Sequence, residues 1–291
     1  MRYTAEPKPR RYFMKRYVCV SLLFVILLQT SVAYAGPALT KPTLEAWKIY
    51  VDRTQERING ELKTLPASLR SDPAVLKAGK IQVQRLETKS SKGKEIEIPD
   101  GSVHHWLGAI FIPGVSLEKV VSWVQNYPQY KDYFKDVDRA EIRSQSGDTY
   151  EIFLRLKRSK LGVTAHFNTK HHVVYGPRSP GFLASISQST EIRQIKDAGT
   201  SSETEYPEGD DSGYLWRLNS YWRFTERDGG VIVECETIGL SRSLGWGLGF
   251  LNILTLGKVK SIAESIAREA LEQTLTDLRD GVRGGPKKDA D

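Results

Sequence analysis

Five histidines are the side chains of this sequence best suited to metal binding or proton transfer: His104, His105, His166, His171 and His172. They include two adjacent pairs, and neighbouring residues on a strand point to opposite faces of a sheet. Neither pair can therefore chelate one ion as a unit. No cysteine or carboxylate at metal-ligand spacing accompanies them, so the sequence predicts neither a metal site nor a cofactor.

Nucleophilic catalysis has equally little support. Cys235 is flanked by Glu234 and Glu236, whose negative charges do not lower the pKa of a thiol. The sequence contains no G-x-S-x-G or H-E-x-x-H motif and no phosphate-binding glycine loop. Cys235 is therefore interpreted as a small core residue.

The remaining catalytic hypothesis is proton transfer by His171 together with Tyr150 or Tyr175. The sequence gives no distances among these three side chains. Proton-transfer catalysis is therefore kept only as an alternative to ligand binding.

Strands with one apolar face are predicted where side chains alternate. Residues 214–240 read YLWRLNSYWRFTERDGGVIVECETIGL, which is two alternating runs joined by a Gly-rich turn. The predicted inward face is large on the first run and small on the second: Tyr214, Trp216, Leu218, Ser220, Trp222 and Phe224 against Val231, Val233, Cys235, Thr237 and Gly239. The small face leaves volume for a ligand, or else the two faces interdigitate into a solid core.

Three earlier strands extend this inward face. Alternation predicts that it includes Tyr150, Ile152, Leu154 and Leu156; then Val163, Ala165, Phe167, Thr169, His171, Val173 and Tyr175; then Phe182, Ala184, Ile186, Gln188, Thr190 and Ile192. A buried polar group without a partner costs about 1–3 kcal/mol. The polar members of this face are therefore explained most simply by contact with water or a ligand, although a β-bulge would shift the register.

The order of elements is also readable from the sequence. Helical spacing predicts an amphipathic helix over residues 43–63, and residues 80–101 read as an edge hairpin. A strand over 103–112, a helix over 116–127, an aromatic turn and an antiparallel meander follow. The final helix is predicted over 261–279, opened by a capping box of Ser261 and Glu264.

This order resembles the START-like, or SRPBCC, superfamily, which includes polyketide cyclase-like and coenzyme Q-binding-like proteins. The stretches SLEKVVSWVQNYPQYKDYFKDVDRAEI and SYWRFTERDGGVIVECETIGLSR carry the resemblance. It implies an α+β helix-grip fold, in which a curved antiparallel sheet wraps around a long C-terminal helix and encloses a cavity for apolar or amphipathic ligands.

We accordingly expect a hydrophobic or amphipathic ligand, such as a lipid, a quinone or a polyketide-like compound. The alternative that the resemblance implies is a cyclase-type or dehydratase-type enzyme that acts on a hydrophobic substrate. The expected binding residues are Tyr150, Leu154, Phe167, Thr169, His171, Ile186, Gln188, Thr190, Trp216, Leu218, Ser220, Trp222, Thr237, Trp246 and Phe250. The last two belong to LGWGLGFLNILTLGK, which is interpreted as a lid or as a patch that contacts a membrane transiently. The alternative is that this segment is the first turn of the final helix, buried against the N-terminal extension. A further alternative is an interaction module with a filled core, in which the helix over 43–63 docks a partner.

The first 35 residues have the parts of a secretory signal peptide: basic residues between positions 8 and 16, the apolar run VCVSLLFVILL, and Ala33-Tyr34-Ala35. The apolar run is shorter than the roughly 20 residues that a spanning helix needs. We expect cleavage after Ala35 and a periplasmic or secreted bacterial protein.

Removing this segment changes the charge balance. Residues 1–35 hold six of the 42 basic residues and one of the 35 acidic ones, so the remaining chain has a net charge of +2. Nucleic acids are excluded as partners, because binding them needs clustered positive charge. The expected divisions are a signal peptide (1–35), an N-terminal extension (36–100), a START-like domain (101–280) and a disordered tail (281–291).

Overall fold

An antiparallel β-sheet of nine strands is the centre of the computed structural model, which describes residues 38–64, 70–160, 163–243 and 253–285. The strands are β1 (Gln82–Arg85), β2 (Gly101–Pro113), β3 (Val137–Ser146), β4 (Thr149–Lys160), β5 (Val163–Ser179), β6 (Phe182–Lys196), β7 (Thr204–Glu205), β8 (Arg217–Arg227) and β9 (Gly230–Arg242). The sheet order is β1-β2-β9-β8-β6-β5-β4-β3, and β7 pairs with β6.

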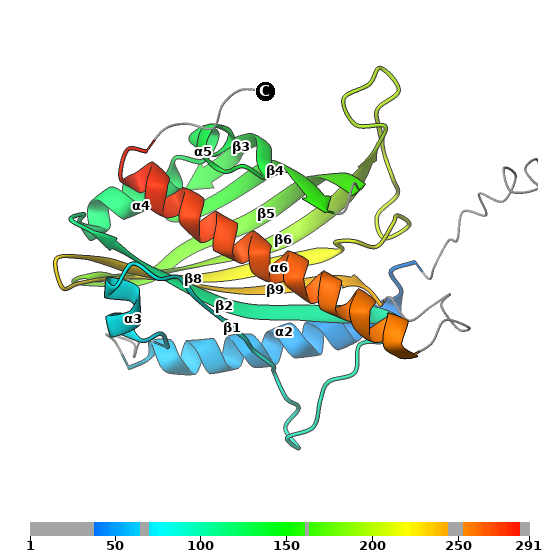
Figure 1. The fold of residues 1–291 in the computed structure, drawn as a ribbon, viewed down its shortest axis with the longest axis horizontal. Coiled ribbons are helices and arrows are strands. Elements are labelled where there is room, and N and C mark those ends of the chain that lie inside the picture. Colours follow the sequence, from blue (N-terminus) through cyan, green and yellow to red (C-terminus); the bar gives the residue numbers. More distant parts are fainter. Residues whose placement is uncertain (1–37, 65–69, 161–162, 244–252, 286–291) are drawn as a thin grey trace, which may run out of the picture. The chain divides into compact units, whose positions relative to one another are not determined.

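Helices lie on both faces of this curved, unclosed sheet (Figure 1). They are α2 (Lys41–Leu62), α3 (Pro73–Lys77), α4 (Leu117–Gln125), the 3₁₀ turn η1 (Tyr127–Gln129), α5 (Tyr130–Tyr133) and α6 (Ile253–Val282). We call the two sides of the sheet the α6 face and the α2 face. The predicted α+β class, with a curved sheet and a long C-terminal helix, is confirmed.

The β8–β9 hairpin forms as its alternation predicts. Its two turn residues, Asp228 and Gly229, have φ angles of 56° and 75°. Both angles lie in the left-handed region that a two-residue type I′ turn requires. The resulting register sets Ser220 opposite Thr237 and Trp222 opposite Cys235.

The final helix packs closely on the sheet at a glycine. A Cβ atom at Gly108 of β2 would lie 2.6 Å from Leu275 Cδ1 and 2.9 Å from Leu271 Cγ. Glycine therefore permits this close approach of α6. The helix begins at Ile253, earlier than predicted, so Ser261 lies inside it and the predicted capping box is wrong.

The N-terminal helix covers part of the opposite face. The side chain of Thr40 caps α2 by accepting a hydrogen bond from Thr43 N at 3.4 Å. The apolar side of α2 packs against strands β6, β8 and β9, in a cluster formed by Trp47, Tyr50, Val51, Ile58, Leu62, Phe182, Ala184, Trp216, Tyr221, Ile238 and Leu240. The sheet is thus buried by helices on two sides.

The predicted edge hairpin over residues 80–101 is wrong in its pairing. β1 pairs with β2, with Gln82 opposite Ala109, rather than with the residues that follow it. The expected second arm contributes only the bridge between Lys89 and Glu95. The physical reason is that β2 offers a long edge whose backbone groups β1 can satisfy.

Several expectations lie outside the described residues. These are the signal peptide in residues 1–35, Trp246 and Phe250, and most of the predicted tail. Among the helices that are described, none has the length and apolar character needed to cross a membrane.

Candidate functional site

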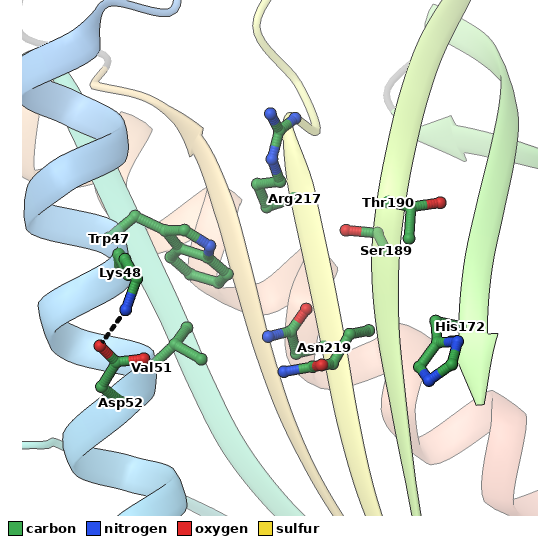
Figure 2. A pocket seen from close by; sticks show the side chains of 10 residues that line it. Trp47, Lys48, Val51, Asp52, His172, Ser189, Thr190, Arg217 and Asn219 are labelled. Carbon is green, nitrogen blue, oxygen red and sulfur yellow. Dashed lines mark hydrogen bonds and ion pairs between the residues drawn. The ribbon is translucent and has the colours of Figure 1, made fainter. Parts of the chain in front are cut away.

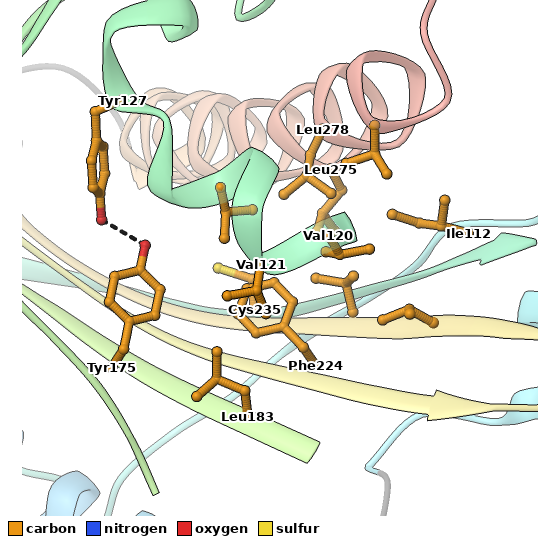
Figure 3. Close-up of a cluster of buried hydrophobic side chains, with 14 of the residues drawn as sticks. Ile112, Val120, Val121, Tyr127, Tyr175, Leu183, Phe224, Cys235, Leu275 and Leu278 are labelled. Carbon is orange, nitrogen blue, oxygen red and sulfur yellow. Dashed lines mark hydrogen bonds between the residues drawn. The ribbon is translucent and has the colours of Figure 1, made fainter. Parts of the chain in front are cut away.

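One half of the α6 face is filled by side chains. Residues from α4, α6 and the strands interdigitate there: Ile112, Val120, Val121, Leu183, Phe224, Cys235, Leu275 and Leu278, all buried (Figure 3). Burial raises the pKa of the Cys235 thiol far above its usual value, which leaves it unreactive. This half behaves as an ordinary close-packed core.

An aromatic group closes that half of the face at β4 and β5. Tyr127 and Tyr175 share a hydrogen bond of 2.7 Å between their hydroxyls, and burial raises the pKa of both. Tyr150, an expected binding residue, packs on both rings and accepts a hydrogen bond from Gln145 Nε2 at 2.8 Å. These rings are partnered by one another, so Tyr150 has a packing role.

The other half of the α6 face is only half-buried, and a row of polar side chains crosses it. Thr237 of β9 is opposite Ser220 of β8, and Ser220 is opposite Ser187 of β6. We call Thr237, Ser220 and Ser187 the polar row. All three are partly exposed, and neither Ser220 nor Thr237 forms a side-chain hydrogen bond to another described residue. The row therefore has unused hydrogen-bonding capacity.

Two tryptophans, Trp106 and Trp222, lie next to the polar row. Trp106 of β2 is opposite Thr237, and its buried Nε1 has no hydrogen-bond partner among the described residues. Trp222 lies two residues after Ser220 in β8, on the same face, and stacks on Phe224 with 6.1 Å between ring centroids. Both tryptophans are partly buried and pack against the core of the α6 face. An indole nitrogen can only donate, so Trp106 offers an unmet donor here.

His171 lies at the β5 end of the polar row. Its Nε2 is 3.0 Å from Thr169 Oγ1, and its Nδ1 is 3.4 Å from Ser187 Oγ. The side chain is 4% exposed, and burial lowers its pKa to about 4. Neutral at pH 7 and a weak base, it suits orientation of a polar group better than proton transfer.

Apolar side chains flank the row on both sides. Leu154 and Leu218 are half-buried on the α6 face, and Phe167 and Ile192 are buried beside Leu218. Among the expected binding residues, the structure brings Leu154, Phe167, Leu218, Thr169, His171, Ser220, Trp222 and Thr237 to this face. The resulting surface is largely apolar with a few convergent polar groups, which is the composition of small-molecule sites.

The expected orientation of β6 is wrong over most of its length. Leu183, Ser185 and Ser187 lie on the α6 face, whereas Ile186 packs in the α2-face cluster and Gln188 lines a groove on that side. The register shifts by one residue between β5 and β6 near Tyr175, and again near Lys170. The second shift leaves Thr190 exposed as the extra residue and returns Ile192 to the α6 face.

Trp216 is a second error of orientation. It precedes β8, and its backbone N–H donates to Leu240 O at 2.7 Å. Its indole Nε1 donates to Asp211 Oδ1 at 3.2 Å, and its ring is buried in the α2-face cluster. The alternation that holds from Leu218 onward does not extend to residues before the strand.

Two residues of this surface were missed by the sequence argument. Ser187 was missed because the β6 register was misjudged. Trp106 could have been found, since the alternation in VHHWLGAIFI sets His104, Trp106 and Ile110 on one face, where Ile110 is buried in the core of the α6 face.

A second polar cluster joins α2 to the sheet and resembles a catalytic array. Tyr50 Oη is 2.9 Å from His105 Nδ1, and His105 Nε2 is 2.7 Å from Glu236 Oε1. Arg57 and Arg70 also bind the Glu236 carboxylate. Tyr50, His105 and Glu236 are at most 5% exposed. No substrate can reach them without displacing α2, so the cluster holds the helix in place.

Metal binding receives no support from the described residues. They contain no group of three or more His, Cys, Asp or Glu side chains placed to hold an ion. His171 and His172, adjacent in sequence, lie on opposite faces of the sheet, the first beside Ser187 and the second beside Glu151 and the α2-face groove.

The chain matches no family model, and no curated protein is significantly similar to it. A solved STAR-related lipid transfer protein from Xanthomonas axonopodis is 15% identical, with 74% of this chain and 98% of that chain covered and a TM-score of 0.48. The Zhui aromatase/cyclase from Streptomyces sp. R1128 is 13% identical, with 62% of this chain and 94% of that chain covered and a TM-score of 0.40. Human STARD10 is 8% identical, with 73% of this chain and 81% of that chain covered and a TM-score of 0.40. At these identities the likeness concerns the fold alone.

Proposed function

We propose that this protein binds a hydrophobic or amphipathic small molecule on the half-buried part of the α6 face. The observation that carries the proposal is the buried Trp106 Nε1, which lacks a partner among the described residues and stands beside Thr237. An unmet buried donor costs about 1–3 kcal/mol. A ligand oxygen placed there would accept a hydrogen bond from the indole and remove that cost. In a core that binds no ligand, an apolar side chain at this position would avoid the cost altogether.

The chemistry of this surface defines the polar end of the ligand. Trp106 can only donate, and the hydroxyls of Ser220 and Thr237 can donate as well as accept. The common requirement is an acceptor oxygen, as in the carbonyl of a lipid ester, a quinone or a polyketide-like compound. The apolar body would lie against Trp222 and Leu218, where each buried methylene contributes about 0.8 kcal/mol.

Export is part of the proposal. It is supported by the basic, apolar and small-residue segments of residues 1–35, which have the order of a secretory signal peptide. A carrier outside the cytoplasm would meet lipids and quinones at a membrane surface.

The test is native mass spectrometry of the protein purified without detergent, followed by solvent extraction of any bound compound and its return to the stripped protein. We expect a reproducible bound mass and saturable rebinding. A protein that carries no added mass, and that takes up nothing from lipid and quinone extracts, would contradict the proposal.

A conservative variant locates the site. Trp106→Phe keeps an aromatic ring but removes the indole N–H, and we expect rebinding to weaken by roughly tenfold, as for the loss of one hydrogen bond to a buried group. Trp123→Phe is the matched control, because Trp123 lies in the aromatic group with Tyr130, Tyr133 and Phe134. Equal affinities for both variants would place the ligand elsewhere.

A further inference from the structure

The α2 face carries a groove that the proposed function does not use. It has a volume of about 450 Å³ and lies between α2 and strands β5, β6 and β8 (Figure 2). Its lining is Trp47, Lys48, Val51, Asp52, His172, Gln188, Ser189, Thr190, Arg217 and Asn219. The volume falls within the range of small-molecule sites, about 300–1,000 Å³.

Two carboxamides lie side by side in the groove. Gln188 of β6 and Asn219 of β8 are directly opposite each other in the sheet, so their side chains project from the same face. Gln188 forms no hydrogen bond to another described residue. Asn219 is 5% exposed and lies next to Tyr221 on the same face. Burial raises the pKa of Tyr221 to about 12, against a lowering effect of Asn219.

The charged groups of the groove and its histidine already have polar partners. Lys48 Nζ lies 2.5 Å from Asp52 Oδ2 on α2, as the dashed line in Figure 2 shows. Arg217 Nη1 lies 2.8 Å from Glu208 Oε1. His172 Nδ1 lies 2.5 Å from Glu151 Oε1. A charged ligand would compete with these pairs, whereas a neutral ligand would leave them intact.

An apolar wall on α2 completes the groove. The side chains of Trp47 and Val51 extend from the helix toward the groove (Figure 2). Both are 7% exposed, so they present a limited apolar surface rather than a deep pocket. A ligand that fits must therefore combine a small apolar patch with neutral groups that both donate and accept hydrogen bonds.

We infer that this groove binds a neutral sugar that carries hydroxyl and amide groups, of the N-acetylhexosamine class. Each carboxamide offers two N–H donors and one acceptor oxygen, and a hydroxyl can satisfy either end. The acetamido group matches the carboxamide pair, while its methyl and the C–H groups of the ring match Trp47 and Val51. The inference is independent of ligand binding on the α6 face, because the groove lies on the other side of the sheet.

The test is a titration of the ¹⁵N-labelled protein with N-acetylglucosamine, followed in the side-chain amide and indole N–H resonances. We expect saturable shifts of the Gln188, Asn219 and Trp47 signals, with a dissociation constant on the order of 1 mM for so open a site. Glucosamine and glucuronate serve as cationic and anionic counterparts and are expected to bind at least about tenfold more weakly.

Variants separate this groove from other surfaces. Gln188→Ala and Asn219→Ala should each reduce the affinity for N-acetylglucosamine by about tenfold or more. Ser185→Ala is the matched control, because Ser185 also belongs to β6 but lies on the α6 face and outside the polar row, and it should leave the affinity unchanged. Unshifted groove resonances in the wild-type protein, or tighter binding of a charged sugar, would overturn the inference.

Discussion

The contact between α6 and Gly108 gives the sharpest test of how the final helix sits on the sheet. Replacing Gly108 with alanine adds one methyl group at a position where it would lie 2.6 Å from Leu275 Cδ1. Carbon atoms in contact are normally about 3.5–4.0 Å apart, so the leucine or the whole helix must move by about 0.9 Å. Leu275 is fully buried and Leu271 is 4% exposed, so neither has free space to enter.

Overpacking of this kind costs about 1–3 kcal/mol of unfolding free energy. For a protein of this size each kcal/mol lowers the melting temperature by about 2–4 °C. The measurement is equilibrium unfolding in urea followed by tryptophan fluorescence, with a thermal melt as a second readout. A larger residue, in Gly108→Val, should lower the stability further.

Gly239→Ala is the matched control. Gly239 lies in β9, and a Cβ there would meet its nearest atoms only at 4.0 Å. Its unfolding free energy should therefore remain within about 0.5 kcal/mol of wild type. If Gly108→Ala were as stable as Gly239→Ala, the close seating of α6 on β2 would be refuted.

Two further predictions concern buried ionisable groups. Glu236→Gln removes the carboxylate that Arg57 and Arg70 both bind, and should lower the unfolding free energy in urea by about 1–3 kcal/mol, since Arg70 loses its ion pair and Arg57 keeps only Glu61; an unchanged midpoint would contradict this role. His171 has a folded pKa of about 4, below its ordinary 6.5, so the unfolded chain takes up the proton more readily. Its contribution to stability is complete above pH 6.5 and is lost as the pH falls toward 4. When the pH is lowered from about 7 to about 5, the unfolding free energy of His171→Phe should therefore fall by roughly 2 kcal/mol less than that of the wild type.

The orientation of side chains was predictable from the sequence in β8 but not in β6, for a physical reason. In β8 the alternation from Leu218 to Phe224 is marked, and the Asp228-Gly229 turn fixes the register, so the inward face was placed correctly. In β6 the residues FLASISQST carry apolar or small side chains on both sides. Helices cover both faces of the sheet, so no polar face marked the outside.

Bulges and strand ends account for the other errors. The register shift near Thr190 leaves one residue unpaired, and nothing in the local composition marks it. The orientation of Trp216 is determined by its bonds to Asp211 and Leu240, which are tertiary contacts. The start of α6 was placed late because a capping pattern at Ser261 exists in the sequence but is not used at a helix end.

The polar contacts of α2 also bear on the order in which the chain can fold. Arg57 binds Glu236, which lies 179 residues further along the chain, and Arg223 binds Glu61 across 162 residues. Contacts between such distant positions form only after a large loop has closed, and topologies rich in them fold slowly. Helix α2 therefore cannot complete its docking until β8 and β9 have been synthesised. We expect the formation of β8 and β9, rather than that of α2, to be the rate-limiting step of folding.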